Sequence, residues 1–437
     1  MIVMKFGGSS VKDAQKFLEV AEIVKSRLDK KPIVVLSAVK GVTDNLIKAL
    51  SESIHGKFDS YKEIEAKHKE ILKGLELDQS TVDDELKELK EALDVNSKLK
   101  EDNHKILDYI SFFGERMSSK ILSALLVKQG IASNYHISGD IGLQTDSNFG
   151  DATFLESSYE VMHKNLAGAD YVPVITGFGG KDENGEFTTF NRGGSDYVAS
   201  LVGAGVRSEE IQIWTDVNGV MTTDPRIVPE ARTIPELSFA EAAELAFFGA
   251  KVLHPKTIKP AMDKNIPVKV LNTYEPENPG TTIVPASNVQ SGVMKAIASK
   301  KNVTILNLCS ARMLNAYGYL AKVFEVFNKN KKSVDMITTS EVNLSITVDS
   351  EDKLDKIAAE LEKYGNVKID TNKALVCVVG EGMKQTPGIL GELFSILGKD
   401  NINIDMISQG ASEINVSFIV NNIDADKVVK VLHKAFF

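Results

Sequence analysis

Three glycine-bearing segments of the sequence combine a flexible backbone with charged side chains that could hold phosphate groups. The first is KFGGSS, from Lys5 to Ser10, placed where a strand passes into a helix. Glycines at such a turn let backbone N–H groups approach a phosphate, and the helix N-terminus adds a favourable dipole. The ammonium of Lys5 could reach the same phosphate. A Gly-Gly pair is also typical of an ordinary strand–helix turn, and the sequence has neither GxxxxGK[ST] nor GxGxxG.

The second segment is NRGGSD, from Asn191 to Asp196, which follows a GFGG run. Arg192 stands beside two glycines, an arrangement that suits bidentate binding of a carboxylate or a phosphate. Ser195 and Asp196 open the next predicted helix. Residues of these types are also expected there simply as helix caps.

The third segment is WTDVNGVMTTDPR, from Trp214 to Arg226. A buried strand ends at Thr215 and Asp216, and strand ends are where open α/β sheets bind ligands. A type I turn around Asp224 explains the following proline but not the whole polar cluster. Further along, FGAKVLHP places Lys251 between a helix and a loop. A lone lysine in that position is more often solvated surface.

Together these segments indicate phosphoryl transfer, because such catalysis depends mainly on positioning and on neutralising charge. The sequence supplies cations, backbone amides and an aspartate, Asp196, that could orient a metal or a lysine. No Ser–His–Asp set, HExxH motif or cysteine pair competes for the role. The candidate cations are Lys5, Lys251, Arg192 and Arg226.

The elements around these segments predict an α/β fold with a parallel sheet. The chain begins with strand (1–6), glycine turn, helix (13–28) and strand (32–37), and further strands are expected at 171–176 and 210–215. Between residues 52 and 103 the sequence is dense in Lys and Glu with leucine at helical spacing, which predicts a helical insertion with a solvated face. Helices are expected near 239–248 and 256–264, and Tyr274–Gly280 is interpreted as a boundary.

The C-terminal part repeats itself at an offset of 70 residues, judged by alignment of the sequence with itself. Gly318-Tyr319-Leu320 aligns with Gly388-Ile389-Leu390, and Asp335-Met336-Ile337 aligns with Asp405-Met406-Ile407. A two-residue slip then aligns Asn343 with Asn415. A repeat of this length predicts two copies of one small α+β unit.

The composition excludes several classes of protein. A chain of 437 residues is expected to form two or three domains, and its net charge of −9 with scattered basic residues argues against nucleic acid or a membrane as the main partner. The two cysteines make a disulfide framework implausible. No apolar stretch long enough to span a bilayer is present. We therefore expect a cytoplasmic protein.

Taken together, six short segments make the sequence resemble the aspartate kinases. KFGGSS, SAxxGVTDNL (37–46), FGERMSS (113–119), NRGGSD, WTDVNGVMTTDPR and FGAKVLHP occur in the order seen in that family, and the tail resembles its paired ACT units. The resemblance implies an α/β class fold with an open, mostly parallel sheet sandwiched by helices, the amino-acid kinase fold, in residues 1–285, with the helical insertion at about 52–110. A regulatory region would occupy 293–437, with ACT units of ferredoxin-like α+β type at about 303–370 and 371–437. Whether these units are consecutive, or interleaved through a strand at 293–299, is left open.

The resemblance also implies the activity and its residues. The enzyme would transfer the γ-phosphate of MgATP to the side-chain carboxylate of L-aspartate, the first step of lysine, threonine and methionine biosynthesis, with Mg²⁺ held mainly by the ATP phosphates rather than by a protein metal site. Met221 stands where many relatives have an aromatic residue, although a flexible thioether can still cover a purine face. Lys5 and Asp196 would be catalytic; Lys5, Phe6, Gly7, Gly8, Thr215, Asp216, Met221, Arg226, Lys251 and Val252 would bind ATP; Thr43, Glu115, Arg192 and Ser195 would bind aspartate.

The tail is predicted to sense an amino acid, by resemblance to lysine-inhibited members of the family. Asp335 suits the ammonium of an effector, although Asp is also a common turn residue. ACT pairing across subunits would give a homo-oligomer, dimer or tetramer. The effector site would include Met313, Ala316, Gly318, Leu320, Val334, Asp335, Ser340 and Glu341.

Two alternatives remain at this stage. A sibling kinase acting on glutamate or a related substrate would share the glycine loops, and assay on aspartate against glutamate would separate the two. A catalytically inactive amino-acid sensor would be expected to lose its reactive residues, yet Lys5, Arg192, Asp196 and Lys251 are all present.

Overall fold

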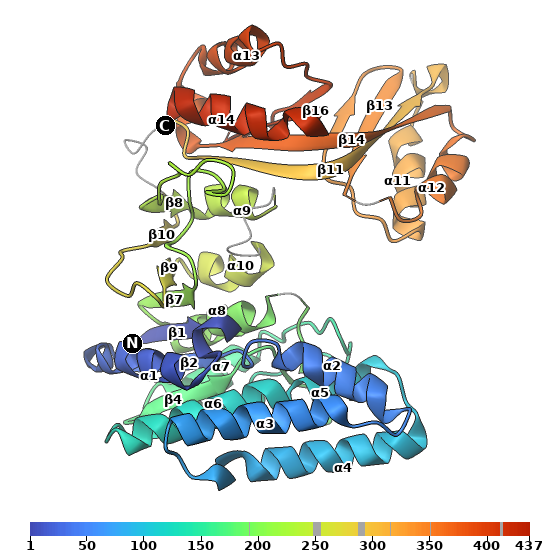
Figure 1. The fold of residues 1–437 in the computed structure, drawn as a ribbon. Helices are drawn as coiled ribbons and strands as arrows, with labels where there is room; N and C mark the ends of the chain where they lie inside the picture. Colours follow the sequence, from blue (N-terminus) through green and yellow to red (C-terminus); the bar gives the residue numbers. More distant parts are fainter. Residues whose placement is uncertain (192, 248–254, 287–292, 315, 350, 411–413) are drawn as a thin grey trace. The chain divides into compact units, whose positions relative to one another are not determined.

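The computed structural model describes residues 1–437 except 192, 248–254, 287–292, 315, 350 and 411–413. The chain divides into two compact units (Figure 1). The first comprises Met1–Val220, Pro235–Phe239 and Val252–Ser287, and the second comprises Met221–Ile234, Ala240–Lys251 and Asn288–Phe437. Two segments from the middle of the chain thus belong to the same unit as the C-terminal tail.

An eight-stranded sheet forms the centre of the described part of the first unit. All neighbouring strands pair in parallel except β9 and β10, so the prediction of an open, mostly parallel α/β sheet is confirmed. In spatial order the strands are β3 (Ser133–His136), β4 (Val172–Thr176), β2 (Pro32–Leu36), β1 (Ile2–Phe6), β7 (Glu210–Thr215), β9 (Val268–Asn272), β10 (Thr281–Val284) and β8 (Glu236–Ser238).

The central strands are mostly apolar because helices cover both faces of a parallel sheet. Every residue of β1, β2 and β4 is buried. The helix after β1 starts where Asp13 accepts a hydrogen bond from the Lys16 backbone N–H at 2.9 Å. The helices of this unit are α1 (Ala14–Lys25), α2 (Val42–Ser53), α3 (Asp59–Gly74), α4 (Asp83–Leu99), α5 (His104–Ser111), α6 (Phe113–Lys128), α7 (Ser158–Leu166), α8 (Gly194–Val206) and α10 (Pro255–Asp263).

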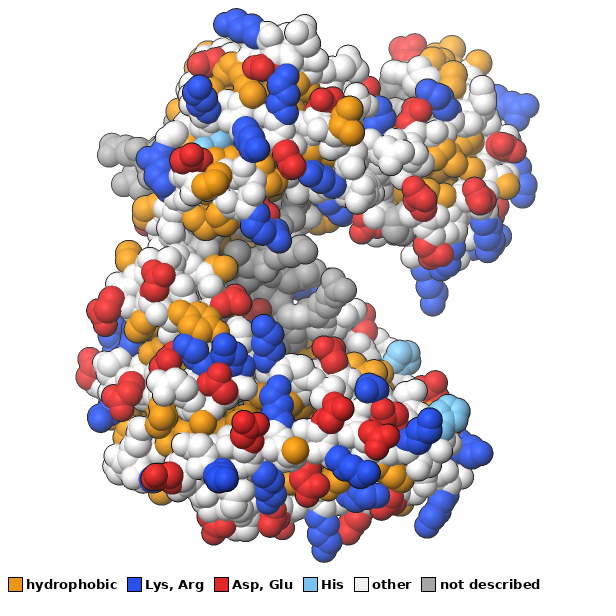
Figure 2. All heavy atoms as spheres, viewed as in Figure 1, with side chains coloured by type: hydrophobic (Ala, Val, Ile, Leu, Met, Phe, Trp, Pro, Cys, Tyr) orange, Lys and Arg blue, Asp and Glu red, His pale blue; other side chains and the backbone are white. Residues whose placement is uncertain are grey.

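Helices α3 and α4 form the predicted helical insertion (Figure 1). Their apolar faces, with Ile64, Ile71, Leu89 and Leu93, pack into the same core as the central strands. On the outer face, Lys and Glu side chains are interspersed (Figure 2). The charge-rich composition is therefore a solvated face, as expected.

The short elements of the first unit complete its loops. They are η1 (Gly8–Val11), η2 (Leu28–Lys30), η3 (Gln79–Val82) and the antiparallel pair β5 (Gly179–Lys181) and β6 (Phe187–Thr189). The expectation of a boundary at Tyr274–Gly280 is wrong, because this segment joins β9 to β10 within one sheet. Prolines and a glycine with φ of +62° at Gly280 mark this connection just as they would mark a linker.

The second unit contains a six-stranded antiparallel sheet. In spatial order its strands are β12 (Ile337–Thr339), β13 (Asn343–Val348), β11 (Ala296–Cys309), β14 (Asn366–Val379), β16 (Asn415–Asn421) and β15 (Met406–Ser408). The helices are α9 (Phe239–Phe247), α11 (Tyr319–Lys329), α12 (Leu354–Leu361), α13 (Ile389–Lys399) and α14 (Ala425–Phe436), with short turns η5 (Ala311–Met313), η6 (Glu381–Gln385) and η7 (Asn422–Asp424).

The predicted repeat is present in these elements. Helices α11 and α13 have bounds that differ by 70 residues, and each follows a left-handed glycine, Gly318 at φ +70° and Gly388 at φ +86°. Each helix pair packs through its own apolar cluster, α11 and α12 around Val323 and Ile357, and α13 and α14 around Leu393 and Val428.

The two copies share their long strands. The second half of β11, Thr304–Cys309, pairs with β13, whereas its first half, Ala296–Lys301, pairs with Ala374–Val379 of β14 beside β16. The strand expected near 293–299 therefore lies in the sheet of the second copy although it precedes the first copy in sequence. In the described residues, no helix is long and apolar enough to cross a membrane.

Candidate active site

A cavity of about 320 Å³ opens in the first unit where the loops after β1 and β2 meet the start of α8. Carboxyl ends of parallel strands are the usual ligand-binding edge of such sheets. The structure brings together six of the predicted site residues here. The cavity is lined by Lys5, Gly8, Ser37, Ala38, Val39, Lys40, Gly41, Thr43, Asp44, Glu115, Phe178, Gly193, Gly194, Ser195 and Asp196.

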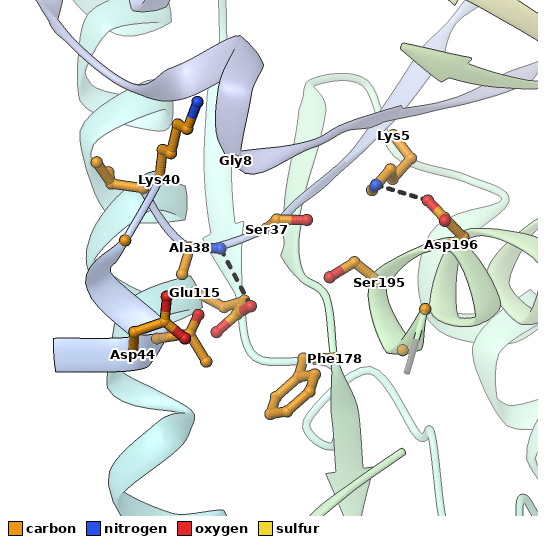
Figure 3. Close-up of a pocket in the computed structure, with 15 residues that line it drawn as sticks. Lys5, Gly8, Ser37, Ala38, Lys40, Asp44, Glu115, Phe178, Ser195 and Asp196 are labelled. Atoms are coloured by element: carbon orange, nitrogen blue, oxygen red, sulfur yellow. Dashed lines mark hydrogen bonds and ion pairs between the residues drawn. The ribbon is translucent and has the colours of Figure 1, made fainter. Parts of the chain in front are cut away.

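Lys5 and Asp196 form an ion pair in the cavity wall, with Lys5 Nζ 2.5 Å from Asp196 Oδ1 (Figure 3). Lys5 extends from β1, and Asp196 lies in the first turn of α8. The helix-capping interpretation of Ser195 and Asp196 is not supported, because the N-cap position belongs to Gly193 at φ +79°. A carboxylate in the first turn is favoured by the helix dipole, which helps to hold Asp196 beside the lysine.

Glu115 lies at the buried start of α6 with one carboxylate oxygen satisfied and the other not. Its Oε1 accepts a hydrogen bond from the Ala38 backbone N–H at 3.1 Å (Figure 3). Its Oε2 is buried and has no hydrogen-bond partner among the described residues. Burial raises the pKa of Glu115 to about 8, and the Ala38 N–H and the charge of Lys5 offset this only in part. Such a group is suited to pair with a cation that enters the cavity.

Close backbone approach at Gly8 explains why a glycine stands there. A Cβ at this position would lie 2.8 Å from the Ala38 carbonyl oxygen and 3.4 Å from the Lys40 nitrogen. The turn after β1 and the loop after β2 can therefore touch only without a side chain. Their contact shapes one wall of the cavity.

Several residues that line the cavity were not singled out from the sequence. Lys40 occupies a variable position of the SAxxGVTDNL segment, and Asp44 follows Thr43 in the same segment. Phe178 has φ of +75°, a rare conformation for a bulky residue, and its backbone carbonyl accepts from the Phe190 N–H at 2.9 Å. The only sequence signal for Phe178 was its place between two glycines.

The predicted nucleotide residues of the first unit lie at adjacent strand ends. Phe6 is fully buried and stacks on Trp214 with ring centroids 5.7 Å apart, so only its backbone is available to a ligand. The Gly7 N–H donates to the Trp214 carbonyl at 3.3 Å. Thr215 and Asp216 follow directly at the end of β7, beside β1 in the sheet, but they do not line the cavity.

The remaining nucleotide and substrate predictions fall elsewhere. Met221 and Arg226 belong to the second unit, where the exposed Arg226 guanidinium pairs with Asp224 at 2.6 Å. Arg192, Lys251 and Val252 lie outside the described residues. Their assigned roles stay predictions.

The predicted effector residues form two groups in the first copy of the repeat. Met313, Ala316 and Gly318 follow the end of β11, where Cys309 pairs with Asn343, and the Ser340 N–H donates to the Asn343 carbonyl at 2.8 Å. Asp335 instead lies at the other end of β13, where its N–H donates to Thr347 at 2.9 Å and its Oδ2 is 3.1 Å from Lys300 Nζ. Val334 lies with Asp335, whereas Leu320 and Glu341 lie with the first group. One chain therefore does not gather all of these side chains at one point.

No group of three His, Cys, Asp or Glu side chains that could hold a metal ion occurs within the described ranges. A magnesium ion carried by nucleotide phosphates needs few protein carboxylates, because Mg²⁺ keeps several waters and takes phosphate oxygens as ligands. The donor set of the cavity is compatible with such a phosphate-bound ion.

Two family models match the chain. That of the amino acid kinase family matches residues 1–272, and that of the ACT domain matches residues 306–359 and 376–436. The parallel sheet, the glycine-lined cavity and the duplicated α+β unit together define a kinase of the amino acid kinase class that carries ACT units.

Individual relatives narrow the class. The chain is 39% identical over 457 residues to the chloroplastic aspartokinase 2 of Arabidopsis thaliana, covering 100% of this chain and 84% of that protein. It is 35% identical over 456 residues to the lysine-sensitive aspartokinase 3 of Escherichia coli, covering 100% and 99%. The crystal structure of E. coli aspartokinase III in complex with aspartate and ADP matches with a TM-score of 0.82 and 33% identity over 99% of each chain. The chain belongs to the aspartokinase family.

Proposed function

We propose that this kinase transfers the γ-phosphoryl group of MgATP to the side-chain carboxylate of L-aspartate, giving 4-phospho-L-aspartate. The observation that carries the proposal is the buried Oε2 of Glu115, which has no hydrogen-bond partner in the part of the chain that the structure describes and lies in the cavity that also holds Lys5. An amino acid offers an ammonium for Glu115 and an anionic side chain for the cationic side of the cavity. The E. coli relative, solved with aspartate and ADP, supports the same pair of ligands.

Aspartate would be held through its α-amino-acid end, so that its side chain points at the nucleotide. Glu115 would accept the ammonium, and ionisation of its carboxyl would accompany binding because the incoming cation favours the charged form. Thr43 and Ser195 offer hydroxyls from the first turns of α2 and α8. Arg192 is predicted to bind the α-carboxylate bidentately.

The chemical step needs no general base. A free aspartate side chain has a pKa of about 3.9 and is already ionised at neutral pH. Its oxygen forms a bond to the γ-phosphorus, the bond from that phosphorus to the bridging oxygen breaks, and ADP leaves. The barrier is repulsion between two anions, which Lys5 offsets by stabilising charge on the transferring group. Asp196 holds the Lys5 ammonium in place.

The nucleotide would lie along the strand ends next to Lys5. The turn from Phe6 to Gly8 would lie against its phosphates, with the Gly7 N–H held by the Trp214 carbonyl, and Mg²⁺ bound to those phosphates would supply further charge neutralisation. Thr215, Asp216, Met221, Arg226, Lys251 and Val252 complete the predicted nucleotide set.

The ACT units would bind an amino-acid effector and lower the activity. Lysine is the proposed effector, because the E. coli relative is named for its lysine sensitivity. The two groups of predicted effector residues lie at opposite ends of β13. A second copy of the chain, paired antiparallel, could bring Asp335 of one chain to the Gly318 loop of the other. We therefore propose a homo-oligomer whose effector sites lie between ACT units, and whose active and inhibited states are shifted by binding.

The test is product formation from aspartate and MgATP, trapped as the hydroxamate, with and without millimolar lysine. Product that lysine suppresses supports both the kinase and the sensor proposals. Product from glutamate but not from aspartate would mean that glutamate, rather than aspartate, is the substrate. No product from either, with lysine binding intact, would leave a sensor without catalysis.

A further inference from the structure

The loop between β2 and α2 places Lys40 on the cavity at a point where the structure fixes its backbone. The Lys40 Cα would lie 3.5 Å from a Cβ built on Gly8, so this loop rests against the turn that follows β1. Lys67 Nζ of α3 donates to the Lys40 carbonyl oxygen. Gly41, at φ +82°, is then the N-cap residue of α2. The base of the Lys40 side chain is therefore held from both sides.

The charges that line the cavity differ in how they are engaged. Lys5 forms an ion pair with Asp196, with Nζ 2.5 Å from Oδ1. Lys40 is exposed, and among the described residues no carboxylate forms an ion pair with it. The other charged side chains of the lining are carboxyls, those of Asp44, Glu115 and Asp196. Two anionic substrates are proposed to meet in this cavity. Among the described residues that line it, Lys40 is the cation that has no ion-pair partner.

The Lys40 side chain points toward the turn at Gly8 and away from Glu115 and Asp44 (Figure 3). The Gly8 side is where the phosphates are proposed to lie, and the Glu115 side is where the aspartate ammonium is proposed to lie. The direction of the side chain therefore favours a phosphate over the amino acid as its partner. A lysine ammonium acts on phosphate as a mobile point charge with three donors.

We propose that Lys40 contacts the γ-phosphoryl group of ATP and stabilises its charge during transfer, as a phosphate-binding residue in addition to Lys5. The inference rests on the proposed function and deepens it by assigning a second cation to the transferring group. In phosphoryl transfer the charge is spread over the equatorial oxygens, and cations from two directions neutralise it better than one.

The test compares Lys40→Met and Lys40→Gln with Lys48→Met. Lys48 is an exposed lysine on the outer side of α2, 59% exposed and paired with Glu52, so its removal changes the net charge equally without touching the cavity. Calorimetry would measure binding of ADP and of the β,γ-imido analogue of ATP to each folded protein, and steady-state kinetics would give kcat. Thermal melting would check that both Lys40 variants fold, which the exposure of Lys40 leads us to expect.

The expected result is about tenfold weaker binding of the ATP analogue with less than about twofold change for ADP, as for loss of one charge-assisted contact to the third phosphate. The kcat should fall at least about tenfold in both Lys40 variants and stay unchanged in Lys48→Met. Equal losses for ADP and the analogue, or Lys40 variants with wild-type affinity and kcat, would overturn the inference. If the wild-type protein formed no aspartyl phosphate, the proposed reaction would fail instead, while the analogue-against-ADP comparison would still decide whether Lys40 contacts a γ-phosphate.

Discussion

The Lys5 ammonium and the Asp196 carboxylate lie 2.5 Å apart although they are separated by most of the first unit's sequence. Their side chains are only 11% and 17% exposed, so water screens the pair weakly. The lysine is thereby fixed at the end of β1 before any ligand arrives. Preorganised charge of this kind costs no rearrangement at the moment of reaction.

Replacing Asp196 by Asn should slow the chemical step more than it harms folding. The Lys5 ammonium would lose its ionic partner and its fixed position, so kcat is expected to fall about 100-fold, with KM for both substrates changed less. Lys5→Met should lose at least as much. Hydroxamate kinetics and thermal melting of the same samples measure the two effects. A folded Lys5→Met protein with near wild-type kcat would remove Lys5 from the mechanism.

Glu115→Gln should make the protein more stable at alkaline pH while greatly weakening its use of aspartate. The pKa of Glu115 is raised to about 8 in the folded protein. In the unfolded chain it is near the ordinary value of 4.5. Between these values the folded state binds more protons than the unfolded state, so wild-type stability falls as pH rises through this window.

Glutamine does not titrate and can keep the hydrogen bond from Ala38, so the variant escapes this loss. Urea unfolding should show its advantage over wild type growing by more than about 1 kcal/mol between pH 5 and pH 8. The kcat/KM for aspartate should fall about 100-fold, because an amide cannot replace a charge opposite a buried ammonium. A stability difference that does not change with pH would mean that Glu115 does not titrate in this window.

The sequence was sufficient for the residues that sit inside glycine-rich segments. Lys5 and Asp196 stand in such segments, whereas Glu115 was predicted only from the resemblance of FGERMSS to the aspartate kinases. Asp196 was expected to orient a metal or a lysine, and the structure pairs it with Lys5. Residue types and spacing alone do not give this pairing, because it depends on which helix follows which strand in the sheet. Lys40 was passed over for a related reason, since nothing local distinguishes it from a solvated lysine.

The sheet edge was the least predictable part of the fold. Strand β3 reads SNYH and strand β8 reads ELS, sequences with little strand character of their own. They are strands because neighbours in the sheet supply their hydrogen bonds. The repeat in the tail could be predicted because both copies keep a glycine before the first helix, at Gly318 and Gly388. In the structure both glycines are left-handed.

The buried pair of Glu241 and Lys295 should matter for the stability of the second unit. Their charged atoms are 3.6 Å apart with side chains 0% and 2% exposed, and Glu241 Oε1 also accepts from the Glu381 N–H at 2.8 Å. Lys295→Met would remove the cation opposite a buried carboxylate, which typically costs about 3–5 kcal/mol. The double variant Glu241→Gln with Lys295→Met should recover part of that loss. Urea unfolding, together with amide hydrogen exchange in β11 and β14, would measure the loss of stability in each variant. Additive losses in the double variant would contradict a direct coupling of the two side chains.

Lys300 should compete with the effector for Asp335. Lys300 Nζ lies 3.1 Å from Asp335 Oδ2 and 3.5 Å from a carboxylate oxygen of Asp349, and the Asp335 side chain is 7% exposed. Burial raises the pKa of Asp335, and Lys300 offsets this in part. The carboxylate proposed to bind an effector ammonium therefore already holds an ammonium of its own chain. An effector must displace that ammonium or share the carboxylate with it.

Lys300→Met should consequently lower the lysine concentration that gives half inhibition, by about fivefold at pH 8. Asp335→Asn should abolish inhibition while leaving uninhibited turnover intact. Lys373→Met is the matched control, because Lys373 holds Asp405 at 2.6 Å in the second copy of the repeat. Inhibition curves measure the change, and the gain in Lys300→Met should shrink as the pH is lowered, because burial raises the pKa of Asp335 and the variant removes the cation that offsets this. A higher half-inhibition concentration in Lys300→Met at pH 8 would instead mean that Lys300 holds Asp335 in its binding position.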